Sequence, residues 1–264
     1  MIKPEHKKIK QIFGGNFYSI PKYQRPYVWK KAQQISDFWE DLVFQYEQEI
    51  KYNNKTTTSL YLGTIILNTS NNNNKSLVVD GQQRMTTIFI LFVAIRNYLQ
   101  SIISSPDKNL SSDKLASIRG QLTSIQPFIS SSDIAFGTHE RATLEASPSI
   151  KETIDAMADH EWKPPFNKDL DGFREVSQIY NFFEKMIKQD IDLDHIASFL
   201  TALYESSCIV IGIEDMEEAY NLFERTNARG QALTVSDLLK NHLFSKGDNE
   251  NKISEFWDQI TEDS

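Results

Sequence analysis

The chain has 264 residues, of which 40% are hydrophobic and 24% charged, as in ordinary globular proteins. Its formal net charge of -8 argues against a wholly basic nucleic-acid binder, although a local basic groove is still allowed. The single cysteine, Cys208, excludes a disulfide framework and lies in an apolar run. The longest apolar run, residues 88–95, is far shorter than the roughly 20 residues that span a bilayer. We therefore expect a cytoplasmic protein without a membrane partner.

The N-terminal region predicts two short elements. Residues 1–16 are basic and are expected to form a short element or arm that ends in a turn. Residues 17–20 then suit an edge strand, because Pro21 and Pro26 forbid a central one.

The loop that follows, residues 23–29, has an unusual density of aromatic and hydrogen-bonding side chains. Pro21 precedes this loop and Pro26 lies inside it. A proline-stiffened loop loses little entropy when it orders around a ligand. A structural alternative is that its aromatic side chains plug the edge of the core and that Arg25 forms a surface ion pair. We favour a ligand-binding role for Gln24 and Arg25.

A helix, a hairpin and a second helix are expected next. Apolar residues recur with the helical period from residue 33 to residue 50. Strands at 60–67 and 76–80 are expected to pair as a hairpin across a polar loop that contains four consecutive asparagines. A broad apolar stripe predicts a core helix at 85–100. The carboxylates of the first helix are expected on its solvated face: Glu40, Asp41, Glu47 and Glu49.

The junction between the second strand and the core helix carries the clearest indication of a ligand site. A strand that leads directly into a helix N-terminus favours anion binding, because the first helical N–H groups lack partners and the dipole is positive there. Gly81 permits a left-handed backbone, Arg84 offers a bidentate fork to a phosphate, and Asp80 could hold magnesium or a water. In the structural alternative, Asp80-Gly81 is an ordinary turn and Arg84 pairs with a carboxylate; these few residues alone fit both interpretations.

Residues 101–170 are rich in Ser, Asp, Lys and Pro, and they are expected to form an inserted, mostly helical region. A continuous apolar run at 208–213 predicts a strand that is buried on both faces and returns to the sheet. Further helices are expected at 173–187, 193–204 and 216–226. A second polar loop at 227–233 separates the last of these from another capped helix.

Three motifs occur in a fixed order: IPKYQRPYVW at 20–29, DGQQRMTT at 80–87, and FERTNARGQALT followed by DLLKN within 223–241. Together they closely resemble the widespread bacterial family of GmrSD-type restriction N-terminal domains, to which the phosphorothioate-sensing SspE proteins are related. The resemblance covers about residues 10–245.

The resemblance implies an α+β fold, in which a small ParB/sulfiredoxin-like mixed sheet carries a large helical insertion and C-terminal helices. Residues 1–100 and 205–245 would form the nucleotide-binding core, and residues 101–204 the helical insertion. Residues 246–264 would be the helical start of a C-terminal region that could continue in a full-length protein.

The resemblance also implies binding and hydrolysis of GTP or ATP with Mg²⁺, in a system that defends bacteria against phage or modified DNA. Carried over by position, Asp80, Gln83 and Arg84 would be catalytic, with Asp80 as the magnesium ligand. The nucleotide-binding residues would be Gln24, Arg25, Gly81, Gln82, Asn227, Arg229 and Gly230, with Lys240 as a weaker candidate.

The implied partners are a nucleotide, DNA that could be modified, an HNH-type nuclease and a second copy of the chain. No HNH-type histidine–asparagine pattern follows residue 245, so nuclease activity is not assigned to this chain. The alternative is a non-enzymatic module that senses a DNA modification. In that case the loop from Tyr23 to Trp29 would stack on a base, and the N-terminal lysines would contact the backbone.

Overall fold

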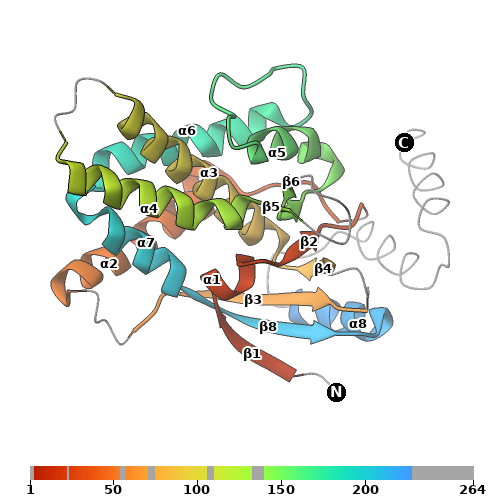
Figure 1. Cartoon of the computed structure of the whole chain (residues 1–264). Helices are drawn as coiled ribbons and strands as arrows, with labels where there is room; N and C mark the ends of the chain where they lie inside the picture. The colour runs from red at the N-terminus through yellow and green to blue at the C-terminus, as the bar shows by residue number, and fades with distance from the viewer. Residues whose placement is uncertain are drawn as a thin grey trace.

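The computed structural model describes residues 3–22, 24–53, 58–70, 75–105, 110–132 and 140–227. Within them the chain folds as α+β, as predicted, with helices stacked on a six-stranded mixed sheet (Figure 1). Whether this sheet is ParB-like stays a prediction.

The strand order of the main sheet is β1-β8-β3-β4-β2-β7. The pairs β3–β8, β2–β4 and β2–β7 are parallel, whereas β1–β8 and β3–β4 are antiparallel. The predicted hairpin of the two central strands and the return of the last strand to the sheet are therefore confirmed. The strands are β1 (Lys3–Lys8), β2 (Phe17–Ser19), β3 (Tyr61–Asn68), β4 (Lys75–Asp80), β7 (Leu144–Glu145) and β8 (Ser207–Ile213), and β5 (Ser130–Ser132) pairs separately with β6 (Glu140–Ala142).

Helices cover both faces of the sheet. On one face, α8 packs through Tyr220 and Phe223 against Ile66 and Val79. The other described helices lie on the opposite face or beyond it, and most of them coincide with predicted helical segments (Figure 1). They are α1 (Ile9–Phe13), α2 (Ser36–Lys51), α3 (Gln82–Ser104), α4 (Ser112–Ile129), α5 (Lys151–Ala158), α6 (Phe173–Asp190) and α7 (Ile196–Glu205), with α8 spanning Met216–Asn227.

The centre of the molecule is α3. Its residues from Ile88 to Ile95 are fully buried, and α4 and α6 pack along it. By length and composition this helix could cross a membrane, but 78% of its most apolar window is buried inside the molecule. The helix is therefore the core helix of this fold.

The prediction of an edge strand at residues 17–20 is wrong. Strand β2 lies between β4 and β7, and it ends at Ser19, so Pro21 and Pro26 fall outside the paired segment and remove no ladder hydrogen bond. Its second neighbour is β7, a two-residue strand whose sequence carries no periodic signal.

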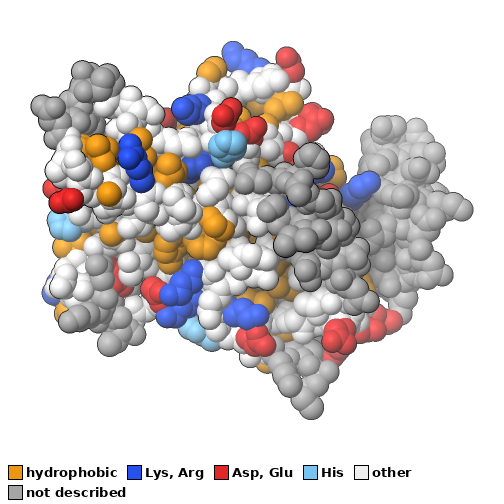
Figure 2. Space-filling view, in the orientation of Figure 1, with side chains coloured by type: hydrophobic (Ala, Val, Ile, Leu, Met, Phe, Trp, Pro, Cys, Tyr) orange, Lys and Arg blue, Asp and Glu red, His pale blue; other side chains and the backbone are white. Residues whose placement is uncertain are grey.

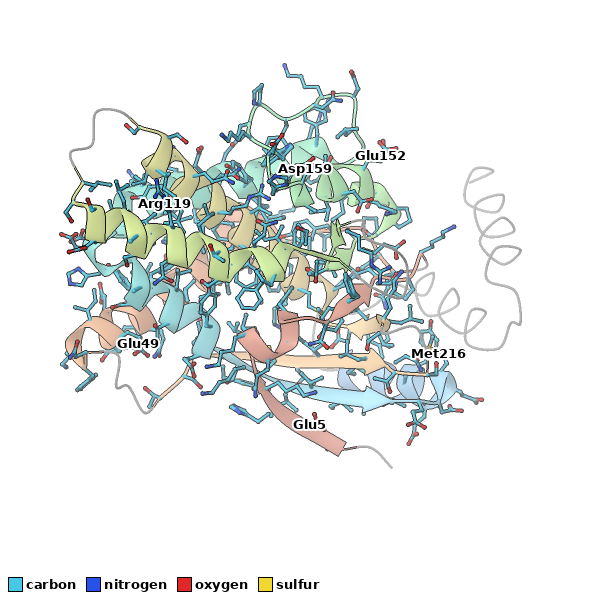
Figure 3. The ribbon with its side chains drawn as sticks, viewed as in Figure 1. Glu5, Glu49, Arg119, Glu152, Asp159 and Met216 are labelled. Atoms are coloured by element: carbon cyan, nitrogen blue, oxygen red, sulfur yellow. The ribbon has the colours of Figure 1, made fainter. Side chains whose placement is uncertain are left out.

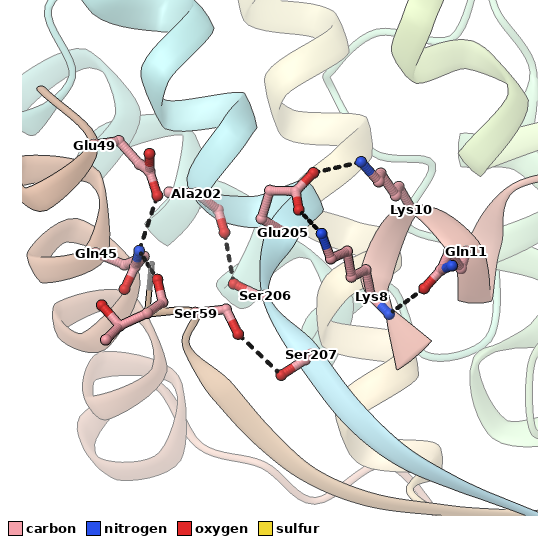
Figure 4. A network of polar contacts seen from close by, with 11 residues as sticks. Lys8, Lys10, Gln11, Gln45, Glu49, Ser59, Ala202, Glu205, Ser206 and Ser207 are labelled. Atoms are coloured by element: carbon pink, nitrogen blue, oxygen red, sulfur yellow. Dashed lines mark hydrogen bonds and ion pairs between the residues drawn. The ribbon is translucent and has the colours of Figure 1, made fainter. Parts of the chain in front are cut away.

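The prediction for the carboxylates of α2 is correct for three and wrong for one. Glu40, Asp41 and Glu47 are exposed, whereas Glu49 is only 3% exposed. The Glu49 Oε1 atom accepts a hydrogen bond of 3.0 Å from Gln45 Nε2, which satisfies the buried carboxylate (Figure 4).

Glu205 ties the N-terminal segment to the end of α7. Its two carboxylate oxygens receive the ammonium groups of Lys8 and Lys10, one each (Figure 4). Lys7 forms a further ion pair of 2.7 Å with Glu5. The basic N-terminal segment is thus largely neutralised by the protein's own carboxylates.

Candidate functional site

The turn between β4 and α3 has the geometry that the sequence predicts. Gly81 is the N-cap of α3, with a φ of 93° in the left-handed region, and a Cβ there would lie 3.1 Å from the Ile65 side chain. No side chain caps this helix, and its first turn contains no acidic residue. The positive end of a 23-residue helix therefore lacks a counter-charge from its own first turn.

The buried side-chain amides of Gln24 and Gln82 link the 23–29 loop to the turn between β4 and α3. The Gln24 Nε2 donates to the carbonyl oxygen of Val79 over 2.8 Å, and the Gln82 Nε2 donates to Gln24 Oε1 over 2.9 Å. Both side chains are less than 9% exposed. The structure thus brings Gln24 and Gln82 together across 58 sequence positions.

Gln83 makes a second set of bonds to the same loop. Its Oε1 accepts from the backbone N–H groups of Val28, at 2.8 Å, and Trp29, at 3.3 Å. Its Nε2 donates to the carbonyl oxygen of Pro26 over 3.1 Å. Because both ends of the amide are engaged, Gln83 positions the loop in this structure, and its predicted catalytic role stays a prediction.

Three charged residues meet beside the helix start. Burial raises the pKa of the Asp80 carboxyl, while a hydrogen bond from the Gly81 N–H and the charges of Arg84 and Arg25 oppose that rise. The Arg84 Nη1 donates to the carbonyl oxygen of Thr64 over 2.8 Å. The Asp80 carboxyl at the start of α3 therefore feels the positive charges of two predicted site residues, Arg84 and Arg25.

Gly63 belongs to this site, although the sequence analysis does not single it out. Its φ is 95°, in the left-handed region that favours glycine, and a Cβ at this position would lie 2.7 Å from Arg84 Nη2 and so displace the guanidinium. The pairing of β3 with β8 shifts register between Tyr61 and Thr64. An isolated glycine inside a strand pattern is the signal that could have indicated this irregularity.

Asp80 fits one mode of magnesium binding. Mg²⁺ is commonly held by one or two carboxylates together with substrate phosphates, rather than by an all-protein cage. The part of the chain that the structure describes holds no cluster of three or more His, Cys, Asp or Glu side chains suited to a metal. A single carboxylate beside two arginines and a helix N-terminus therefore suits a metal that arrives with phosphate.

The third motif falls largely outside the described residues. Asn227 is the last residue of α8, and nothing is described of its side chain. Arg229, Gly230 and Lys240 lie outside the described residues, as does Tyr23. Their predicted roles stay predictions.

Of the described residues expected to stack on DNA or to contact its backbone, Tyr27 and the lysines Lys7, Lys8 and Lys10 are engaged within the protein. Tyr27 is 7% exposed, and its hydroxyl lies 2.7 Å from Thr87 Oγ1, so its ring belongs to the core. On the face shown in Figure 2, basic side chains are scattered among acidic ones. These observations give the DNA-sensing alternative less support than the sequence does.

The comparisons with known proteins agree with the three motifs. The family model described as GmrSD restriction endonuclease, N-terminal domain, matches residues 7–244 of the chain. A search among curated proteins finds no match. The matched range contains the site at the start of α3 and nearly all of the described fold.

Proposed function

The chain belongs to the GmrSD restriction endonuclease N-terminal domain family, and we propose that, within a restriction system, it binds and hydrolyses a nucleoside triphosphate. The family itself supports a role in restriction. The finer proposal is an NTPase switch, with GTP or ATP as substrate and Mg²⁺ as cofactor, located in the bacterial cytoplasm.

One observation carries this proposal: the charges of Arg25 and Arg84 act on the Asp80 carboxyl, which directly precedes the N-terminus of α3, and no side chain caps this helix. The N–H groups of a helix start and two guanidinium groups are the donors that a polyphosphate needs. Arg84 uses one N–H on Thr64, and a guanidinium has five, so donors remain for a phosphate oxygen.

In this proposal each residue has a defined task. Arg25 and Arg84 neutralise the charge that develops on the transferring phosphoryl group. Asp80 would hold magnesium, which would act there as a Lewis acid on the phosphoryl group. Gln24, Gln82 and Gln83 keep the arginine-bearing loop in place, which lowers the reorganisation needed at the moment of reaction.

The hydrogen bonds that hold the 24–29 loop on α3 suggest how hydrolysis would gate a DNA nuclease. The 24–29 loop carries Arg25, whose charge acts on Asp80, and it contacts α3 through buried amides. Release of phosphate would remove the counter-charge of Arg25 and loosen this loop, which is the kind of local change that switches use. The proposed partners are therefore DNA, which could be modified, an HNH-type nuclease, and a second copy of this chain.

The test is phosphate release from ATP, GTP, CTP and UTP with magnesium. We expect Arg25→Ala and Asp80→Asn to lower turnover by about 10² or more, because each removes a group that stabilises the developing charge. Arg84→Ala should do the same, but it also breaks the Thr64 bond, so its thermal unfolding must be measured beside its rate.

Arg119→Ala is the matched control, since Arg119 lies on the exposed outer side of α4 (Figure 3). Wild-type rates in both Arg25→Ala and Asp80→Asn would exclude this site as the hydrolysis centre. If no nucleotide is turned over or bound, and DNA binds in a salt-sensitive way, the non-enzymatic sensing function would replace the proposal.

A further inference from the structure

A shallow apolar groove lies between α2 and α6, with a volume of about 300 Å³. Its apolar lining comes from Trp39, Val43 and Phe44 of α2 and from Phe182 and Met186 of α6. A cavity of ~150 Å³ can hold a benzene molecule, so this groove has room for a large apolar side chain.

Phe44 forms one wall of the groove and is 62% exposed. Because most of its surface is exposed to solvent, the Phe44 ring contributes little to the stability of the fold. The same ring can bury that surface against a partner. Phe44 is therefore available as an anchor for a second molecule.

The floor of the groove is preformed. Trp39 is 2% exposed and meets Phe182 edge to face, with ring centroids 6.5 Å apart. The Trp39 Nε1 donates to Asp190 Oδ2 over 2.8 Å, which fixes the indole in place. Because the groove is already ordered, binding a partner would cost little free energy for rearranging this surface.

The charged residues that line the groove all have the same sign. The charged residues in its lining are Glu40, Glu47 and Asp190, all acidic. Among the described residues, none of the three takes part in an ion pair with the protein's own lysines or arginines. The rim is therefore complementary to a partner with lysine or arginine beside its apolar side chains.

We infer that this groove docks a basic amphipathic helix, which inserts an apolar side chain next to Phe44 and places lysine or arginine on the acidic rim. A domain that acts on DNA must carry such basic side chains, so the DNA-handling partner of the restriction system fits this description. A second copy of the chain fits poorly, because a symmetric contact would bring two acidic rims together. The inference does not depend on nucleotide hydrolysis.

The test uses a labelled helical peptide of about 15 residues, with leucines at i, i+3, i+4 and i+7 and lysines on the flanks of this stripe. A matched peptide carries glutamate in place of every lysine. Binding to the whole chain is followed by fluorescence anisotropy, in which nucleotide plays no part. We expect the lysine peptide to bind and the glutamate peptide not to bind.

Variants of the chain locate the contact. Phe44→Ala should weaken binding of the lysine peptide at least tenfold, and the double variant Glu40→Gln/Glu47→Gln should weaken it and flatten its salt dependence. Asp41→Asn is the matched control, because Asp41 is an exposed acid of the same helix that does not line the groove. It should bind as the wild type does.

Three results would overturn the inference. The first is equal binding of both peptides, and the second is unchanged binding to Phe44→Ala. The third is a dimer, detected by light scattering, that Phe44→Ala dissociates, since the occupant would then be a second copy. Loss of phosphate release in a variant of the nucleotide site would leave all three readouts unaffected, so the two proposals fail separately.

Discussion

At the residue scale, the burial of the ionised Asp80 carboxylate lowers the stability of the fold. Burial raises the pKa of its carboxyl above the ordinary 3.8, despite Gly81, Arg84 and Arg25. An acid with a raised folded-state pKa destabilises the fold when ionised; this penalty is complete above the folded-state pKa and vanishes as the pH falls to 3.8. We predict that Asp80→Asn raises the melting temperature at neutral pH while it lowers phosphate release by about 10² or more.

Calorimetry across the acid range checks this prediction. The gain in melting temperature of Asp80→Asn over the wild type should shrink as the pH falls toward 3.8, because the wild-type carboxyl becomes protonated there. A variant less stable than the wild type at neutral pH would show that the charge of Asp80 supports the fold. Gain of stability with loss of activity is the usual signature of a functional site.

Arg96 is the residue on which a second prediction rests. It is fully buried in the middle of α3, and burial lowers its pKa to about 10. Its guanidinium donates to the carbonyl oxygens of Met157, Asp159 and Trp162, at 2.8 to 3.3 Å. We predict that Arg96→Met lowers the free energy of unfolding by about 3–5 kcal/mol, because it leaves the buried carbonyl of Met157 and the part-buried carbonyls of Asp159 and Trp162 without their donor.

Denaturant unfolding measures this loss. Arg119→Met is the matched control on the neighbouring helix: Arg119 is exposed, so the change should stay within about 0.5 kcal/mol. Equal effects at the two positions would contradict the structural role of Arg96. The sequence could not predict this role, since the acceptors are backbone carbonyls more than 60 positions away.

At the scale of the elements, two glycines give opposite predictions. Gly172 is the N-cap of α6 with a φ of 71°, and a Cβ there would lie 2.4 Å from the carbonyl oxygen of Ser149. Gly120 lies inside α4, where a Cβ would meet nothing within 4 Å. We predict that Gly172→Ala destabilises by more than about 1 kcal/mol, whereas Gly120→Ala stabilises by about 0.5–1 kcal/mol.

Thermal unfolding of the two variants gives the comparison directly. The substitution is the same in both, so the effect of a methyl group on the unfolded chain cancels, and the difference reports the folded backbone. Equal shifts of the melting temperature would mean that the turn before α6 adapts to a side chain. This would contradict the close approach of Ser149 and Ile150 to Gly172.

Elements with a long periodic pattern could be predicted from the sequence, and short ones could not. The core helix α3, the hairpin of β3 and β4 and the strand β8 follow from local apolar patterns, although β8 is not buried throughout: Ile209 and Ile211 are half-buried and Gly212 is exposed. Strands β2 and β7 have only three and two residues, so their pairing depends on distant chain segments. For this reason local patterns do not predict that β2 lies between β4 and β7.

At the scale of the whole molecule, one part of the candidate site can be predicted from local sequence and the other part depends on contacts between distant segments. The turn at Asp80 and Gly81 is local, and the sequence predicts its left-handed glycine. The hydrogen bond between Gln24 and Gln82 depends on the parallel pairing of β2 with β4, which no local pattern contains. Resemblance of three motifs supplied what periodicity could not: the expectation that distant loops share one pocket.

The last prediction concerns the folding unit. A single apolar cluster contains Ile65 and Val78 from the sheet, residues of α3, and Ile118 and Tyr180 from the predicted insertion. The insertion also supplies β7 to the main sheet, where the Lys75 ammonium of β4 pairs with Glu145. Because α3 is buried between these parts, the predicted core and insertion should unfold together, in one transition with equal calorimetric and van't Hoff enthalpies.

A deletion variant is a stricter test of whether the predicted core and the insertion form one folding unit. Replacing residues 101–204 by a Gly/Ser linker would expose the fully buried α3 face that packs against α4 and α6. We expect such a chain to lack a cooperative transition and to bind a hydrophobic dye, as a loosely packed state does. Two separate transitions in the intact chain, or a cooperatively folding deletion variant, would instead show that the sheet with α3 is an independent domain and that the insertion is an addition to it.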